Sequence, residues 1–104
     1  MIVEQRTYTV QPGKVPEMVR LYGEEGLALQ QRYLGKFIGY FTTETGNLNQ
    51  VVFMWGYDSL DDREARRARM AQDPVWQKYV EKVVAIVDKQ ENVILRPTHF
   101  SPIR

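Results

Sequence analysis

The 104-residue chain predicts an α+β fold in which one antiparallel sheet carries helices on one face. Segments that alternate β-forming and polar residues, or that concentrate aromatic and β-branched residues, indicate strands. Segments with apolar residues at three- and four-residue steps indicate amphipathic helices. These segments follow one another in the order strand, helix, strand, strand, helix, strand, with turn residues between most of them.

The first strand and the first helix are expected in the opening third of the chain. Residues Ile2 to Val10 alternate β-forming and polar side chains, and Pro12-Gly13 supplies a turn because Pro fixes φ and Gly accepts positive φ. Apolar residues then recur at helical steps from Val15 towards Tyr33. Gly23 and Gly26 each weaken this helix by about 1 kcal/mol relative to Ala, so we expect a kink or a loosened turn there.

A β-hairpin and a second helix are expected next. The segments Phe37–Thr43 and Asn49–Tyr57 are rich in aromatic and β-branched residues, and Thr45-Gly46-Asn47 provides the turn between them. Ser59, with Asp62 three residues later, fits a variant of the capping box and predicts the start of a helix. Because acidic residues flank the arginines of this helix, we interpret them as a solvated surface: Arg63, Arg66, Arg67 and Arg69.

The last helix and the last strand complete the expected order. Asp73 is the expected N-cap and Pro74 the first helical residue, and an apolar stripe extends from Val75 to Val87. The segment from Asn92 to Pro97 is expected to form the fourth strand. The order matches the ferredoxin-like βαββαβ arrangement, with a four-stranded antiparallel sheet, and we expect residues 1–104 to form a single domain.

The strand Val51–Trp55 predicts that both faces of the sheet are covered. It is apolar at every position, whereas a strand with one wet face alternates apolar and polar residues. The predicted helices suffice for one face only. We therefore expect the sheet of a second subunit to cover the other face, which would produce a homodimer with a dimeric α+β barrel. The alternative is that one face lines a pocket, and both expectations can hold together.

Composition excludes several classes of function. A chain without cysteine forms no disulfides, iron–sulfur clusters or cysteine-ligated zinc sites. A formal net charge of +1 argues against nucleic acid as a partner, and no apolar run approaches the length of a membrane span. The amino terminus lacks the pattern of a secretory signal, so we expect a cytoplasmic protein. No glycine-rich phosphate loop occurs, and we expect no cofactor.

Metal binding and nucleophilic hydrolysis also lack support. His99 is the only histidine, and one histidine without cysteine does not make a usual metal site. We expect no metal and an exposed His99. Of the two serines, Ser59 is committed to the helix cap, and Ser101 lies too close to His99 along the chain for a Ser-His-Asp triad. Catalytic residues therefore stay unassigned.

The strand-to-helix run from Asn49 to Arg63 resembles the NIPSNAP family, whose members often read Asn-Gln-Val-Val-His, an apolar residue, Trp, a variable residue and Tyr. Phe53 occupies the place of that histidine here. The resemblance extends to Ile2–Tyr8, to Pro12-Gly13-Lys14 and to Asp73–Trp76. It implies a dimeric α+β barrel akin to cofactor-free monooxygenases, muconolactone isomerases and haem-binding chlorite-dismutase-like proteins. It implies no established reaction.

Aromatic and arginine side chains of the strands form the candidate ligand site. Small planar ligands are usually held in apolar pockets with a few polar groups, and Tyr or Arg can orient an enolate or phenolate oxygen. The candidate ligand-binding residues are Arg6, Tyr8, Tyr40, Phe53, Trp55 and Arg96. Aromatic residues on strands also commonly fill a core or an interface, and that interpretation stays open.

Two functions follow from this site. The first is binding of a small apolar or aromatic molecule, with cofactor-independent oxidation or isomerisation as its catalytic form. The second is a non-catalytic homodimeric module that binds a ligand or a protein. Because Phe53 replaces the histidine of many relatives, the most obvious general base is missing, which weakens the enzymatic interpretation.

Overall fold

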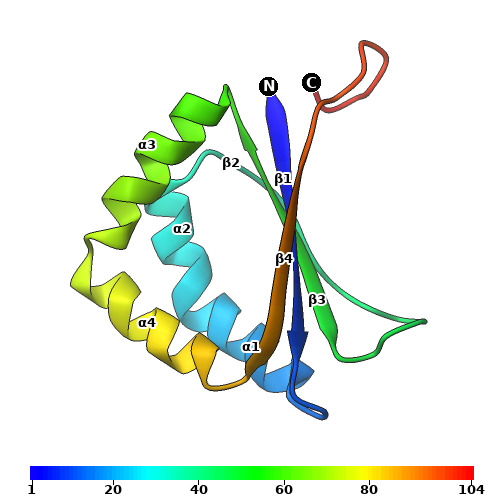
Figure 1. The fold of residues 1–104 in the computed structure, drawn as a ribbon, viewed down its shortest axis with the longest axis vertical. Coiled ribbons are helices and arrows are strands. Elements are labelled where there is room, and N and C mark those ends of the chain that lie inside the picture. Colours follow the sequence, from blue (N-terminus) through cyan, green and yellow to red (C-terminus); the bar gives the residue numbers. More distant parts are fainter.

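The computed structural model describes residues 1–104 and has the predicted ferredoxin-like α+β architecture. The antiparallel sheet has the order β2-β3-β1-β4, and the helices cover one of its faces (Figure 1). The strands are β1 (Ile2–Val10), β2 (Lys36–Thr42), β3 (Gln50–Tyr57) and β4 (Val87–Leu95). The helical elements are α1 (Val15–Leu21), the π-helix η1 (Tyr22–Gly26), α2 (Leu27–Tyr33), α3 (Leu60–Ala71) and α4 (Pro74–Val84). None of the helices combines the length and the apolar character that crossing a membrane requires.

Strand register decides which side chains face the helices. Glu4 lies opposite Trp55 and Arg6 lies opposite Phe53 in the β1–β3 pair. Trp55 and Phe53 are 1% and 2% exposed. Successive side chains of a strand point to opposite faces, so even-numbered residues of β1 and odd-numbered residues of β3 form the helix-facing side. Residues such as Val52 lie on the open side and are only half-buried.

Side-chain caps start α3 and α4 where the sequence predicts them. The Ser59 hydroxyl accepts a hydrogen bond from the Asp62 N–H at 3.0 Å, and the Asp73 carboxylate accepts one from the Val75 N–H at 2.8 Å. In a standard capping box the Asp62 carboxylate would accept from the N–H of the cap residue itself. Here it accepts from the Asp58 N–H at 3.1 Å, one residue earlier.

The π-helix η1 confirms the loosened turn predicted at the two glycines. The Leu27 N–H donates to the Tyr22 carbonyl, which is the wider hydrogen-bonding step of a π-helix. Tyr22 is buried at 3% exposure, and its ring stacks on Tyr40 with centroids 4.2 Å apart. Gly26 lies directly against the Tyr79 ring, so a side chain at this position would collide with that ring.

The predicted boundary between the last helix and the last strand was wrong. Val87 was assigned to the apolar stripe of the helix and the strand to Asn92–Pro97, but α4 ends at Val84 and β4 spans Val87–Leu95. Backbone pairing explains the difference, because Val87 pairs with Val10 and β4 follows β1 along most of its length. The helix stripe continues into apolar residues that belong to the turn and the strand, and periodicity alone does not separate them.

We expect Gly26→Ala to lower the free energy of unfolding by about 1–3 kcal/mol, because the new methyl group must displace the Tyr79 ring in a packed core. Gly23→Ala is the matched control in the same π-helix, since nothing lies within 4 Å of the added carbon. The free energy of unfolding of Gly23→Ala should be unchanged or higher by up to about 1 kcal/mol. Urea unfolding measures the stability of both variants. Equal free energies of unfolding for Gly26→Ala and Gly23→Ala would contradict the packing role of Gly26.

Candidate ligand site

A cavity of about 150 Å³ lies between the helix-facing side of the sheet and the helices. A cavity of this volume can hold one aromatic ring. Its aromatic wall consists of Tyr8, Tyr22, Phe53, Trp76 and Tyr79, with aliphatic residues of α1 and α4 between them. Its polar wall consists of Arg6, Gln30, Arg67 and Gln90. The cavity thus combines apolar surface with a few polar groups, as small-molecule sites do.

Aromatic stacking holds the aromatic wall in place. The Tyr40 and Phe53 rings lie 5.1 Å apart with an interplanar angle of 21°, and Tyr40 also stacks on Tyr22. Tyr8 meets Phe53 edge-on, with ring centroids 5.1 Å apart. Such contacts stabilise aromatic pairs beyond the area that they bury. The wall is therefore formed before any ligand binds.

A buried carboxylate organises the charged part of the site. Glu4 is 1% exposed, and its Oε2 accepts hydrogen bonds from Arg63 at 2.7 Å, from Asn92 at 2.8 Å and from Arg6 at 3.0 Å. The other guanidinium nitrogens of Arg6 donate to the Tyr8 hydroxyl at 3.2 and 3.4 Å. Because Arg6 and Tyr8 both line the cavity, this network fixes two groups of its wall.

Glu4 is ionised in this network. Burial by itself raises the pKa of Glu4, but hydrogen bonds from Arg63 and Asn92, together with the positive charge of Arg6, lower it to about 2. A carboxylate with such a low pKa is a weak proton acceptor at neutral pH. Glu4 therefore positions arginines and is poorly suited to remove a proton from a ligand.

Burial keeps three tyrosines of this layer protonated. Burial raises the pKa of Tyr22, Tyr40 and Tyr79. Their hydroxyls therefore remain hydrogen-bond donors at neutral pH, and the Tyr22 hydroxyl donates to the Gln30 side-chain oxygen at 2.6 Å. The arrangement of donors and cations suits a negatively charged oxygen better than it suits general-base catalysis.

Several buried polar atoms in the layer between sheet and helices have no hydrogen-bond partner. They are Glu4 Oε1, the Tyr40 hydroxyl, Trp55 Nε1, the Tyr57 hydroxyl and Arg63 Nε. An unpaired buried polar group costs about 1–3 kcal/mol, so natural proteins keep few of them.

The structure brings five of the six predicted ligand-binding residues to the helix-facing side of the sheet. Arg6, Tyr8 and Phe53 line the cavity. Tyr40 lies behind this lining in the aromatic stack. Trp55 does not line the cavity either, and its side chain is buried at 1% exposure.

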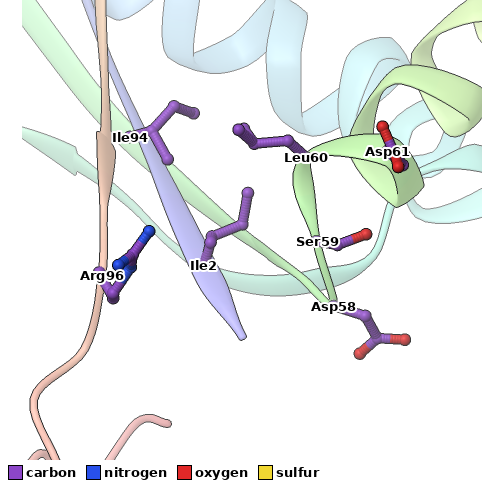
Figure 2. Close-up of a pocket in the computed structure, with 7 residues that line it drawn as sticks. All are labelled: Ile2, Asp58, Ser59, Leu60, Asp61, Ile94 and Arg96. Atoms are coloured by element: carbon purple, nitrogen blue, oxygen red, sulfur yellow. The ribbon is translucent and has the colours of Figure 1, made fainter.

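Arg96 lies elsewhere, beside an open hollow where β1 and α3 begin (Figure 2). This hollow measures about 560 Å³, and Figure 2 shows the apolar ends of Ile2, Leu60 and Ile94 directed toward one another, whereas Asp58 points away. Leu60 and Ile94 are 55% and 41% exposed, so the hollow is a shallow surface feature. Arg96 is not part of the cavity, because β4 ends at Leu95 and carries it to the edge of the sheet.

Sequence reasoning missed the charged residues of the site. The arginines of α3 were interpreted as a solvated surface, but Arg63 binds the buried Glu4, and Arg67 lines the cavity. Arg66 is partly buried and pairs with Asp62 at 2.8 Å. The available signal was the four-residue spacing of Arg63 and Arg67, which places both on one face of a helix.

We expect Glu4→Gln to destabilise the protein by about 3–5 kcal/mol at neutral pH, because Arg6 and Arg63 lose their buried counter-charge. The folded pKa of about 2 lies below the ordinary value of 4.5, so the ionised carboxylate stabilises the fold above about pH 4.5, and this contribution is lost as the pH falls towards 2. Urea unfolding from about pH 7 to 3 should show the difference between parent and variant shrinking only in the acidic range.

Glu64→Gln provides the control for this prediction, because Glu64 is an exposed carboxylate on α3. Its effect should stay within about 0.5 kcal/mol at every pH. A Glu4→Gln deficit that is as large at about pH 3 as at about pH 7 would refute the charge-based explanation.

Comparison with known proteins identifies the family. Residues 3–102 match the NIPSNAP family. A curated relative, the NipSnap homolog of Dictyostelium discoideum, is 33% identical over 94 residues, which cover 90% of this chain and 41% of that protein. A crystal structure of a NIPSNAP family protein from Agrobacterium tumefaciens is 48% identical, with a TM-score of 0.95 over 99% of this chain and 98% of that one.

The fold extends beyond these relatives. A putative antibiotic biosynthesis monooxygenase from Nitrosomonas europaea has a TM-score of 0.71 over 95% of this chain and 100% of that one, at 11% identity, and therefore shares the fold alone. The chain spans less than half the length of the curated relatives that it matches. The family match and the similar crystal structure both cover nearly the whole chain, and the chain belongs to the NIPSNAP family.

Proposed function

We propose that this NIPSNAP protein binds a small planar molecule with a single ring in the cavity between its sheet and its helices. The supporting observation is the cavity itself, whose aromatic wall is held by stacking and whose polar wall carries arginine. Its volume of about 150 Å³ is smaller than the roughly 300–1,000 Å³ of sites for drug-sized ligands. The cavity therefore favours one ring over a fused ring system.

Cofactor-independent oxidation or isomerisation of this ligand is the catalytic form of the proposal. The structural neighbour named as a putative monooxygenase supports only a common fold. Arg6 and the protonated hydroxyl of Tyr79 line the cavity and can stabilise a developing enolate or phenolate oxygen. Phe53 and the ionised, low-pKa Glu4 offer no effective general base, so the geometry supports binding more strongly than catalysis.

The second candidate is a non-catalytic homodimeric module, and the open face of the sheet favours a homodimer. Phe41, Val93 and Leu95 are 51%, 49% and 43% exposed, and Val52 and Met54 lie between them half-buried. Exposed apolar side chains on an open sheet face commonly mark a protein interface. We propose that the sheet of a second copy packs here as a dimeric α+β barrel, which is compatible with either function.

Filling the cavity should weaken binding of a neutral single-ring probe, 4-fluorobenzamide, which fluorine NMR can follow. Val80 lines the cavity from α4, so Val80→Phe should weaken binding by about tenfold or more. Val84→Phe on the same helix is the matched control, because Val84 is 62% exposed and does not line the cavity. It should bind the probe like the parent.

Two results would overturn the proposed pocket. One is a parent protein that does not bind the probe, and the other is a folded Val80→Phe variant that binds it as well as the parent. Circular dichroism establishes folding. If Val80→Phe unfolds, Val80→Leu makes a smaller addition at the same position and should still weaken binding.

Light scattering after size exclusion tests the proposed homodimer. The parent should be a dimer at micromolar concentration, and Val52→Lys should be a monomer because it places a charge in the middle of the open face. Val84→Lys, on the exposed side of α4, should leave the dimer intact. A parent protein that stays monomeric at every concentration would contradict this prediction.

A further inference from the structure

We propose that the ligand of the cavity is an organic anion, and that its charged oxygen binds the guanidinium group of Arg67. This inference rests on the proposed function. It adds the charge of the ligand and the residue that recognises this charge.

Positive charge exceeds negative charge beside the cavity. Glu4 is the buried carboxylate of this layer, and it already pairs with Arg6 and Arg63. Arg67 lines the same cavity as Arg6 and adds a third guanidinium group. Three positive charges therefore face one negative charge, and an anionic ligand would reduce the excess.

Arg67 differs from the other arginines of α3 in its burial and its partners. Arg63 pairs with Glu4 at 2.7 Å and Arg66 pairs with Asp62 at 2.8 Å, whereas Arg69 is exposed to solvent. Arg67 is partly buried and forms no ion pair with a carboxylate of the chain. Partial burial of a cation without a counter-charge is unfavourable, so a negative oxygen at this position would be stabilising.

The neighbouring Tyr57 does not supply that counter-charge. Burial and the negative charge of Glu4 raise the pKa of Tyr57, and the positive charge of the adjacent Arg67 offsets part of this effect. The phenol is therefore close to Arg67, but it is neutral and leaves the charge of the guanidinium uncompensated. The charge of Arg67 stays available to a ligand in the cavity.

The rest of the cavity defines the class of anion. The aromatic wall accepts one planar ring, and Gln30 on the polar wall already accepts a hydrogen bond from Tyr22 at 2.6 Å. A carboxylate, enolate or phenolate attached to a ring would place the ring against aromatic side chains and its oxygen against Arg67. Hydrogen bonds between guanidinium groups and such oxygens are among the strongest in proteins.

A pair of isosteric probes tests the inference. Titration calorimetry at low salt compares 4-fluorobenzoate with 4-fluorobenzamide, which have the same ring and differ in charge. The parent should bind the benzoate about tenfold more tightly or better. Arg67→Gln should abolish this preference and leave the affinity for the amide unchanged. Arg69→Gln, an exposed arginine on the same helix, should retain the full preference.

The outcomes separate this inference from the proposed function. Equal affinities for the two probes in the parent, or a preference for benzoate that survives Arg67→Gln, would overturn the anion inference while binding of the amide upholds the pocket. Binding of neither probe would overturn both. Arg67→Lys keeps the charge and should keep part of the preference, and in the parent that preference should decline as salt is added.

Discussion

The buried carboxylate of Glu4 is the constraint on which the rest of the site depends. An ionised group at 1% exposure must be neutralised where it lies, and arginines from β1 and α3 do so, while an asparagine from β4 adds a hydrogen bond. The same contacts hold α3 over the sheet and place Arg6 in the wall of the cavity. Buried ion pairs contribute little net stability on average, whereas an unpaired partner is strongly unfavourable. The network therefore specifies one arrangement of strand and helix.

The π-helix and the aromatic stack determine the shape of the cavity. The wider turn at η1 accompanies the burial of Tyr22 against Tyr40, and the absence of a side chain at Gly26 lets Tyr79 approach. π-helical turns of this kind are frequent at functional sites. The resulting cavity is rich in donors and cations and lacks an effective base. Its chemistry, and not the shared fold, supports the binding of a small planar ligand.

Local patterns in the sequence were sufficient for most of the secondary structure. Alternation predicted β1, and caps at Ser59 and Asp73 predicted the starts of α3 and α4, because these signals depend on a few neighbouring residues. The prediction that placed Val87 in the helix was wrong for the opposite reason. The place of Val87 in β4 depends on pairing with a strand more than 70 residues earlier, which competes with the helical pattern.

Short runs such as Asn49–Tyr57 were sufficient to predict the first three strands, the helix caps and the family. The sequence leaves open which face of the sheet meets the helices, because Val51–Trp55 is apolar on both faces, and the packing of the helices settles it. The same packing also decides which charges are buried together. Glu4 meets Arg63 across 59 positions of sequence and Asn92 across 88, and such contacts arise from strand register and helix packing that no local pattern encodes.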